Sequence, residues 1–161
     1  MTRPSMRHAW ALAAILLFGL PYSPLLPLEQ PTKSGTRFFD APSQSAEFIG
    51  YARSLRLTPA QQQLRDRVLE RIPAPCCAKF PARTCCCPCN LAKSIWGLSN
   101  FVIARENADA AALEKAVRGW IRFVNPGGFT GNACDTAGGC ARKFSANGCG
   151  GMDERNLHAA R

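Results

Sequence analysis

The 161-residue sequence has little histidine and lacks several motifs that identify enzyme classes. Its 2 histidines leave little material for a histidine-rich metal site or a Ser-His-Asp hydrolase. The absence of the phosphate-binding pattern GxxxxGK(S/T) argues against a P-loop NTPase, and the absence of C-x-x-C-H argues against covalent c-type haem. Long basic runs are also missing, because the arginines and lysines are scattered. The net charge of +9 therefore predicts a solvated basic surface and no nucleic-acid partner.

Alternating strand patterns longer than a few residues are absent as well, so the expected fold is all-α. We expect a small bundle of three to four helices after an N-terminal apolar segment, with an irregular Gly/Cys-rich C-terminal region. The expected helices cover residues 46–55, 58–71 and 89–104, and a last one that starts at Asn107 or Asp109 and ends at residue 124. Thr58, Pro59 and Gln61 form a capping-box start for the second of these helices.

The N-terminal residues 1–28 have the features of a signal peptide or signal-anchor. Arg3 and Arg7 precede an apolar run over residues 9–20, which is too short to span a bilayer alone as a helix. No small-residue cleavage site is visible, so an uncleaved anchor competes with a cleaved signal. We expect an extracytoplasmic body, periplasmic or on the outer face of the inner membrane, that is either secreted or bound to the membrane through this segment.

The rest of the chain divides by composition into three parts. Residues 29–44 read as a linker. Residues 45–125 form the expected helical domain, which contains the first cysteine cluster. Residues 126–161 form the Gly/Cys-rich tail, which we expect to pack on that domain.

The 9 cysteines are clustered, with six between residues 76 and 89 and the others at Cys134, Cys140 and Cys149. One use for them is a structural or interaction module held by disulfides, each worth ~2–4 kcal/mol in an oxidising compartment. The tail cysteines would then pair with members of the first cluster. Because the total is odd, at least one thiol of a monomer would stay unpaired.

A second use is a soft-metal site for delivery or sequestration, which is the function we favour. Clustered thiolates suit Cu(I), Zn(II) or an iron–sulfur cluster. We rank Cu(I) first, Zn(II) second because four ligands would not account for nine cysteines, and an iron–sulfur cluster last because it would have to be built after export. The pKa of Cys89, at an expected helix start, should be lowered by the helix dipole. The candidate ligands, in falling order, are Cys85, Cys86, Cys87 and Cys89, then Cys76 and Cys77, then Cys149 with Met152.

A third use is thiol–disulfide exchange at Cys86-Cys87-Pro88-Cys89, a C-x-P-C motif ahead of a helix. A thioredoxin-type enzyme needs a strand before this motif and a βαβ context. Residues 75–84 contain Pro81 and do not read as a strand. We therefore expect a protein that is not an enzyme, with an oxidoreductase using Cys86 and Cys89 as the alternative.

The order of these features resembles the bacterial PCYCGC-motif proteins, which are exported and cysteine-rich. The resemblance rests on Pro75-Cys76-Cys77 and on Cys85-Cys86-Cys87-Pro88-Cys89, and it extends over residues 58–152. The chain has Cys-Cys-Cys-Pro-Cys in place of P-C-x-C-G-C, and it has no lipobox cysteine. The resemblance implies an exported, thiol-based protein, and it transfers no catalytic residue. Separately, we expect a protein partner whose identity the sequence does not give.

Overall fold

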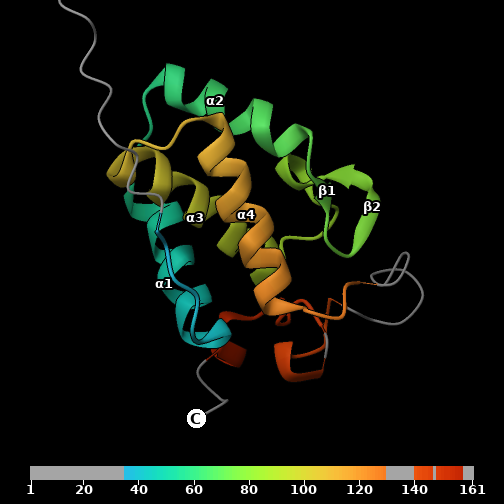
Figure 1. Cartoon of the computed structure of the whole chain (residues 1–161). Helices are drawn as coiled ribbons and strands as arrows, with labels where there is room; N and C mark the ends of the chain where they lie inside the picture. The colour runs from blue at the N-terminus through green and yellow to red at the C-terminus, as the bar shows by residue number, and fades with distance from the viewer. Residues whose placement is uncertain (1–34, 130–139, 147, 158–161) are drawn as a thin grey trace, which may run out of the picture. The chain divides into compact units, whose positions relative to one another are not determined.

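The computed structural model describes residues 35–129, 140–146 and 148–157. Within these residues the chain is mainly helical, as expected, but it is not all-α, because it also contains one small sheet (Figure 1). The predicted signal segment and Cys134 lie outside the described residues. None of the helices within the described ranges has the length and apolarity needed to cross a membrane.

The first two helices are capped by side chains. Helix α1, Ala41–Ser54, begins five residues earlier than expected, because the Asp40 side chain accepts from the Ser43 N–H and Pro42 fits the first turn. Helix α2, Pro59–Glu70, has Thr58 as its N-cap, and both hydrogen bonds of the predicted capping box are present.

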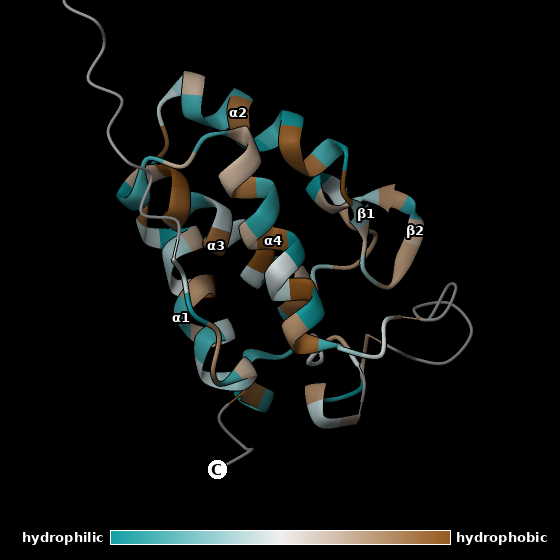
Figure 2. Cartoon of the chain, in the orientation of Figure 1, coloured by the Kyte–Doolittle hydropathy of each residue, from teal (hydrophilic) through white to brown (hydrophobic). Residues whose placement is uncertain are grey.

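Helix α3, Asn90–Glu106, packs against α1, α2 and helix α4, Ala110–Val124. Asp109 caps α4 through the Ala112 N–H, whereas Asn107 ends α3 with a left-handed φ of 51°. Figure 2 shows polar and apolar residues alternating along α2 and α4, as expected for helices with one buried face.

Trp120 of α4 is completely buried at the centre of the core. Its indole contacts the rings of Phe38, Phe48 and Phe123 at centroid distances of 5.1, 5.1 and 5.7 Å. Its N–H donates to the Ser94 hydroxyl of α3 at 2.9 Å, so the polar atom of this side chain is also satisfied.

The expectation that residues 75–84 contain no strand was wrong. Strands β1, Pro73–Ala74, and β2, Cys77–Pro81, pair antiparallel, with Pro73 opposite Pro81. Prolines are tolerated here because the sheet has only two strands, so each strand is an edge. The short helix η1, Ala82–Thr84, follows, and the Ala82 carbonyl accepts from the Trp96 indole, which attaches this hairpin to α3.

Candidate metal centre

Cys76 lies in the turn between β1 and β2 and is 0% exposed. The hairpin holds this turn in place at its base, where the Ala82 N–H donates to the Ile72 carbonyl at 2.7 Å. The irregular pairing of Ala74 with Cys77 leaves only Pro75 and Cys76 to reverse the chain. The Cys76 side chain is therefore buried by the fold of the hairpin itself.

Cys89 is the N-cap residue of α3 and is 1% exposed. The first two N–H groups of the helix, from Asn90 and Leu91, donate to the carbonyls of Gly151 and Cys149 at 2.8 and 3.0 Å. The backbone of Ala92 contributes to the lowered pKa of Cys89, but the Cys89 side chain makes no capping hydrogen bond. The first two N–H groups of α3 are thus satisfied by the C-terminal segment, residues 140–146 and 148–157, in place of a side-chain cap.

Two hydrogen-bonding side chains hold the C-terminal segment on α3. The Asn90 amide donates to the carbonyls of Gly150 and Asp153 at 2.8 and 2.9 Å, and Lys93 donates to the Met152 carbonyl at 3.0 Å. The segment also folds back on itself, because the Gly150 N–H donates to the Arg142 carbonyl. These bonds fix Cys149 beside the start of α3.

Gly150 is required for this arrangement. Its φ is +79°, and a Cβ at this position would lie 2.4 Å from the ring of Phe144 in helix η2, Phe144–Ala146. Any larger residue would displace that ring or the backbone next to Cys149. At least one glycine of the predicted tail, Gly150, therefore shapes the backbone next to Cys149.

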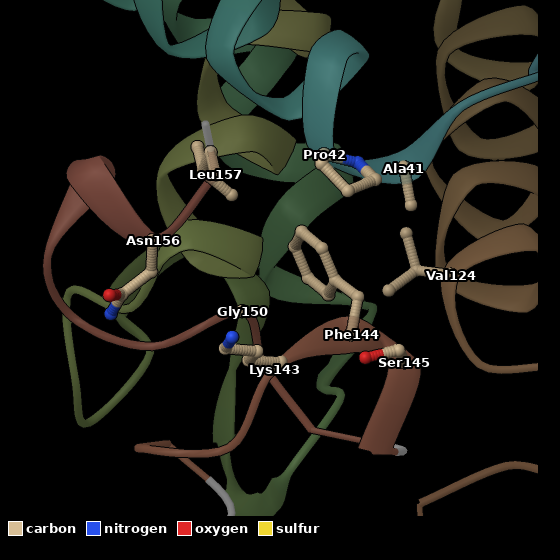
Figure 3. Close-up of a pocket in the computed structure, with 9 residues that line it drawn as sticks. All are labelled: Ala41, Pro42, Val124, Lys143, Phe144, Ser145, Gly150, Asn156 and Leu157. Atoms are coloured by element: carbon tan, nitrogen blue, oxygen red, sulfur yellow. The ribbon is translucent and has the colours of Figure 1, made fainter. Parts of the chain in front are cut away.

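Figure 3 shows that Phe144 and Gly150 also line a cavity of about 350 Å³ between α1, α4 and the C-terminal segment. The other lining residues come from the start of α1, the end of α4 and the C-terminal segment, and they include Val124, Lys143, and Asn156 and Leu157 of helix η3, Glu154–Leu157. None of the described cysteines lines this cavity.

The sulfur atoms of Cys76, Cys140 and Cys149 lie within 4.8 Å of one another. Cys76 and Cys149 are buried and Cys140 is half-buried. The Cys89 thiol interacts with those of Cys149, Cys76 and Cys85. The hairpin, the start of α3 and the C-terminal segment therefore meet in one group of thiols that could hold a metal ion.

The ionisation of this group is uneven. Interactions with the thiols of Cys149, Cys76 and Cys85 lower the pKa of Cys89, and they outweigh the burial that raises it. Cys76 acts to lower the pKa of Cys85, but Cys89 and burial raise it to about 11. The group thus favours a thiolate at Cys89, as expected for a helix start, and a protonated thiol at Cys85.

The remaining predicted ligands lie at different depths. Cys85 is half-buried and turned toward Cys76 and Cys89, while Cys86 is exposed and its sulfur lies 3.6 Å from that of Cys87. Cys77 is buried on β2, and Met152 is 44% exposed. Sequence reasoning ranked the 85–89 stretch first and did not name Cys140 as a ligand. The eight-residue spacing between Cys140 and Cys149 in a glycine-rich segment was the available signal.

Three further observations bear on the disulfide and redox alternatives. Among the described cysteines, no pair of sulfur atoms is at disulfide-bonding distance. The C-x-P-C motif would place its attacking thiol at Cys86, but the thiol with the lowered pKa is the buried Cys89. The sheet that precedes the motif is an antiparallel hairpin and not part of a βαβ unit.

Comparisons with protein-family models, curated proteins and solved structures gave no match.

Proposed function

We propose that this protein binds a soft metal ion, Cu(I) in our expectation, at a thiolate centre formed by Cys76, Cys89, Cys140 and Cys149. The observation that carries the proposal is the meeting of three cysteine sulfurs within 4.8 Å, with the Cys89 thiol interacting with those of Cys76 and Cys149. This grouping does not follow from sequence proximity, since its members span residues 76–149.

The chemistry of the donors restricts the ion. Thiolates are soft ligands that select Cu(I), Zn(II) and iron–sulfur clusters over hard cations such as Mg²⁺ and Ca²⁺. Burial removes competing water, and the helix start favours a negative charge on Cys89. A monovalent soft ion would be satisfied by three of these thiolates, whereas Zn(II) would take four in a tetrahedral arrangement. Three of the sulfurs lie within 4.8 Å of one another, and the donor count found by experiment decides between the two ions.

The location proposed with this function is extracytoplasmic, with residues 1–28 as signal or anchor. This rests on the basic start and apolar run of those residues. A site of this kind outside the cytoplasm would serve sequestration of the ion or its delivery to a protein partner. Fusing alkaline phosphatase, which is active only when exported, to the C-terminus tests the location, and an inactive fusion would contradict it.

The test of the metal centre is the mass of the full chain, purified anaerobically in mild detergent. Native mass spectrometry gives the bound metal, and the mass after denaturation without reductant gives the hydrogens lost to disulfides. We expect a metal adduct whose thiols are protonated after denaturation. A metal-free chain that lacks eight hydrogens would contradict the proposal and indicate four disulfides in a structural module.

Cys76→Ala and Cys77→Ala form a matched pair for the site itself. The two residues are adjacent, and both are buried, at 0% and 1% exposure. We expect Cys76→Ala to weaken Cu(I) binding in competition with bathocuproine disulfonate by more than the ~10–100-fold that loss of an indirect partner causes. Cys77→Ala should leave the affinity nearly unchanged. Equal affinities for the two variants would place the site elsewhere.

A further inference from the structure

The stretch Cys85-Cys86-Cys87 connects the protein surface to the buried thiol group. Cys86 is exposed, Cys87 and Cys85 are half-buried, and Cys89 is 1% exposed. Within five residues the chain therefore passes from a solvent-accessible thiol to a ligand of the proposed centre. The side chains also link the surface to the interior, since the Cys85 thiol interacts with those of Cys76 and Cys89.

The surface thiols are spaced to hold one ion. The sulfurs of Cys86 and Cys87 lie 3.6 Å apart. Two sulfurs on one ion at ~2.3 Å with a tetrahedral angle are separated by about 3.8 Å. Vicinal cysteines can therefore take up an ion here with little movement. Their exposure lets a carrier that still holds the ion approach them.

The deepest ligands of the buried centre are not accessible to such a carrier. Cys76 and Cys149 are each 0% exposed. An ion on a small thiol carrier cannot contact these sulfurs unless the surrounding segments open. A soft ion that exchanges ligands one at a time reaches these sulfurs through a half-buried donor, and Cys85, which interacts with both Cys76 and Cys89, is such a donor, as is Cys140.

We propose that Cys86 and Cys87 receive the soft ion and that Cys85 passes it to Cys89 and Cys76 by stepwise ligand exchange. This inference rests on the proposed function, because it needs the buried centre as the destination. In each step one metal–sulfur bond forms and another breaks. The proton of the incoming thiol passes, directly or through water, to the departing thiolate, and the oxidation state of the ion does not change.

The test measures rate and affinity separately on the full chain. Cu(I) is supplied as its bathocuproine disulfonate complex under anaerobic conditions, and the loss of the coloured complex is followed in a stopped-flow instrument. We expect Cys86→Ala/Cys87→Ala and Cys85→Ala each to slow uptake at least about tenfold, equivalent to ~1.4 kcal/mol of barrier. In Cys86→Ala/Cys87→Ala the affinity at equilibrium and the bound ion count should stay close to those of the wild type.

The control variants separate this inference from the function on which it rests. Cys77→Ala should change neither rate nor affinity, and Cys149→Ala should lose affinity. Unchanged uptake rates in the Cys86→Ala/Cys87→Ala variant would overturn the transfer route while leaving the centre in place. A loss of one bound ion in that variant would also overturn it, because these thiols would then be a final site. A wild-type chain that takes up no Cu(I) would overturn the centre and the route together.

Discussion

The contact between α1 and α3 depends on one glycine, and Gly97→Ala should destabilise the protein. A Cβ at Gly97 would lie 1.6 Å from the carbonyl oxygen of Phe48 and 2.4 Å from its carbonyl carbon. Both are backbone atoms of α1, so no side-chain rotation relieves the clash. Helix α1 would have to move by about 1.4 Å to restore a 3.0 Å contact, which would forfeit much of the dispersion energy between the two helices.

The expected loss follows from two opposing effects. Overpacking in a core costs about 1–3 kcal/mol, and a rigid backbone clash belongs at or above the upper end. Alanine gains about 1 kcal/mol over glycine in a helix interior. We therefore expect the free energy of unfolding to fall by at least ~2 kcal/mol, which lowers the midpoint of thermal unfolding by roughly 4–8 °C in a chain of this size.

Gly50→Ala is the matched control for this prediction. Gly50 lies inside α1, and a Cβ there would have no heavy atom within 4 Å. This variant should gain about 0.5–1 kcal/mol, because only the conformational cost of glycine is removed. Circular dichroism melts of the reduced, metal-free full chain give both values. A Gly97→Ala variant as stable as the wild type would refute the close approach of α1 and α3.

Three further changes test other contacts. Ser94→Ala removes the acceptor of the buried Trp120 N–H and should cost about 1–3 kcal/mol in urea unfolding, against less than ~0.5 for the exposed Ser54→Ala. Asn90→Ala removes both amide bonds to the C-terminal segment and should cost ~2 kcal/mol, and weaker Cu(I) binding should accompany it because Cys149 is held by the same segment. Burial raises the pKa of Glu154, but hydrogen bonds from Arg53 and Lys93 outweigh it and lower the pKa overall. Ionised Glu154 thus adds under ~1 kcal/mol to the free energy of unfolding above its ordinary pKa of 4.5, and this stabilisation is lost as the pH falls below that value. Acid unfolding of Glu154→Gln should lack this part of the pH dependence.

The helices could be predicted from the sequence because their signals are local. The capping box at Thr58 and the cap at Asp109 act within one turn, so the residues that define each start are adjacent in sequence. The early start of α1 was missed because Asp40 and Pro42 were assigned to a linker. The hairpin was missed because two strands of two and five residues, bounded by Pro73 and Pro81, carry no alternation.

The candidate site was only partly predictable, for a different physical reason. Cys89 at the start of α3 follows from a local signal, and its pKa is lowered as expected, but through the thiols of Cys149, Cys76 and Cys85, which the local signal does not reveal. The position of Cys149 depends on the Cys149 and Gly151 carbonyls, which accept from the first N–H groups of α3. Backbone carbonyls are the same in every residue, so no side-chain pattern marks the segment that will dock. Cys140 was not named as a ligand because it is brought in by that docking alone.

The same docking links the proposed centre to the stability of the C-terminal segment. The segment contributes Cys140 and Cys149, and it is attached to α3 by the hydrogen bonds at Asn90, Leu91 and Lys93. An ion bound between Cys149 and the thiols of Cys76 and Cys89 would add a cross-link between the segment, the hairpin and the helix. Part of the free energy of binding would then be free energy of folding, because the ligands are brought together only in the folded state. It follows that the metal and the hydrogen bonds at Asn90 stabilise the same arrangement, so the loss caused by Asn90→Ala should be smaller in the metal-bound protein than in the metal-free one.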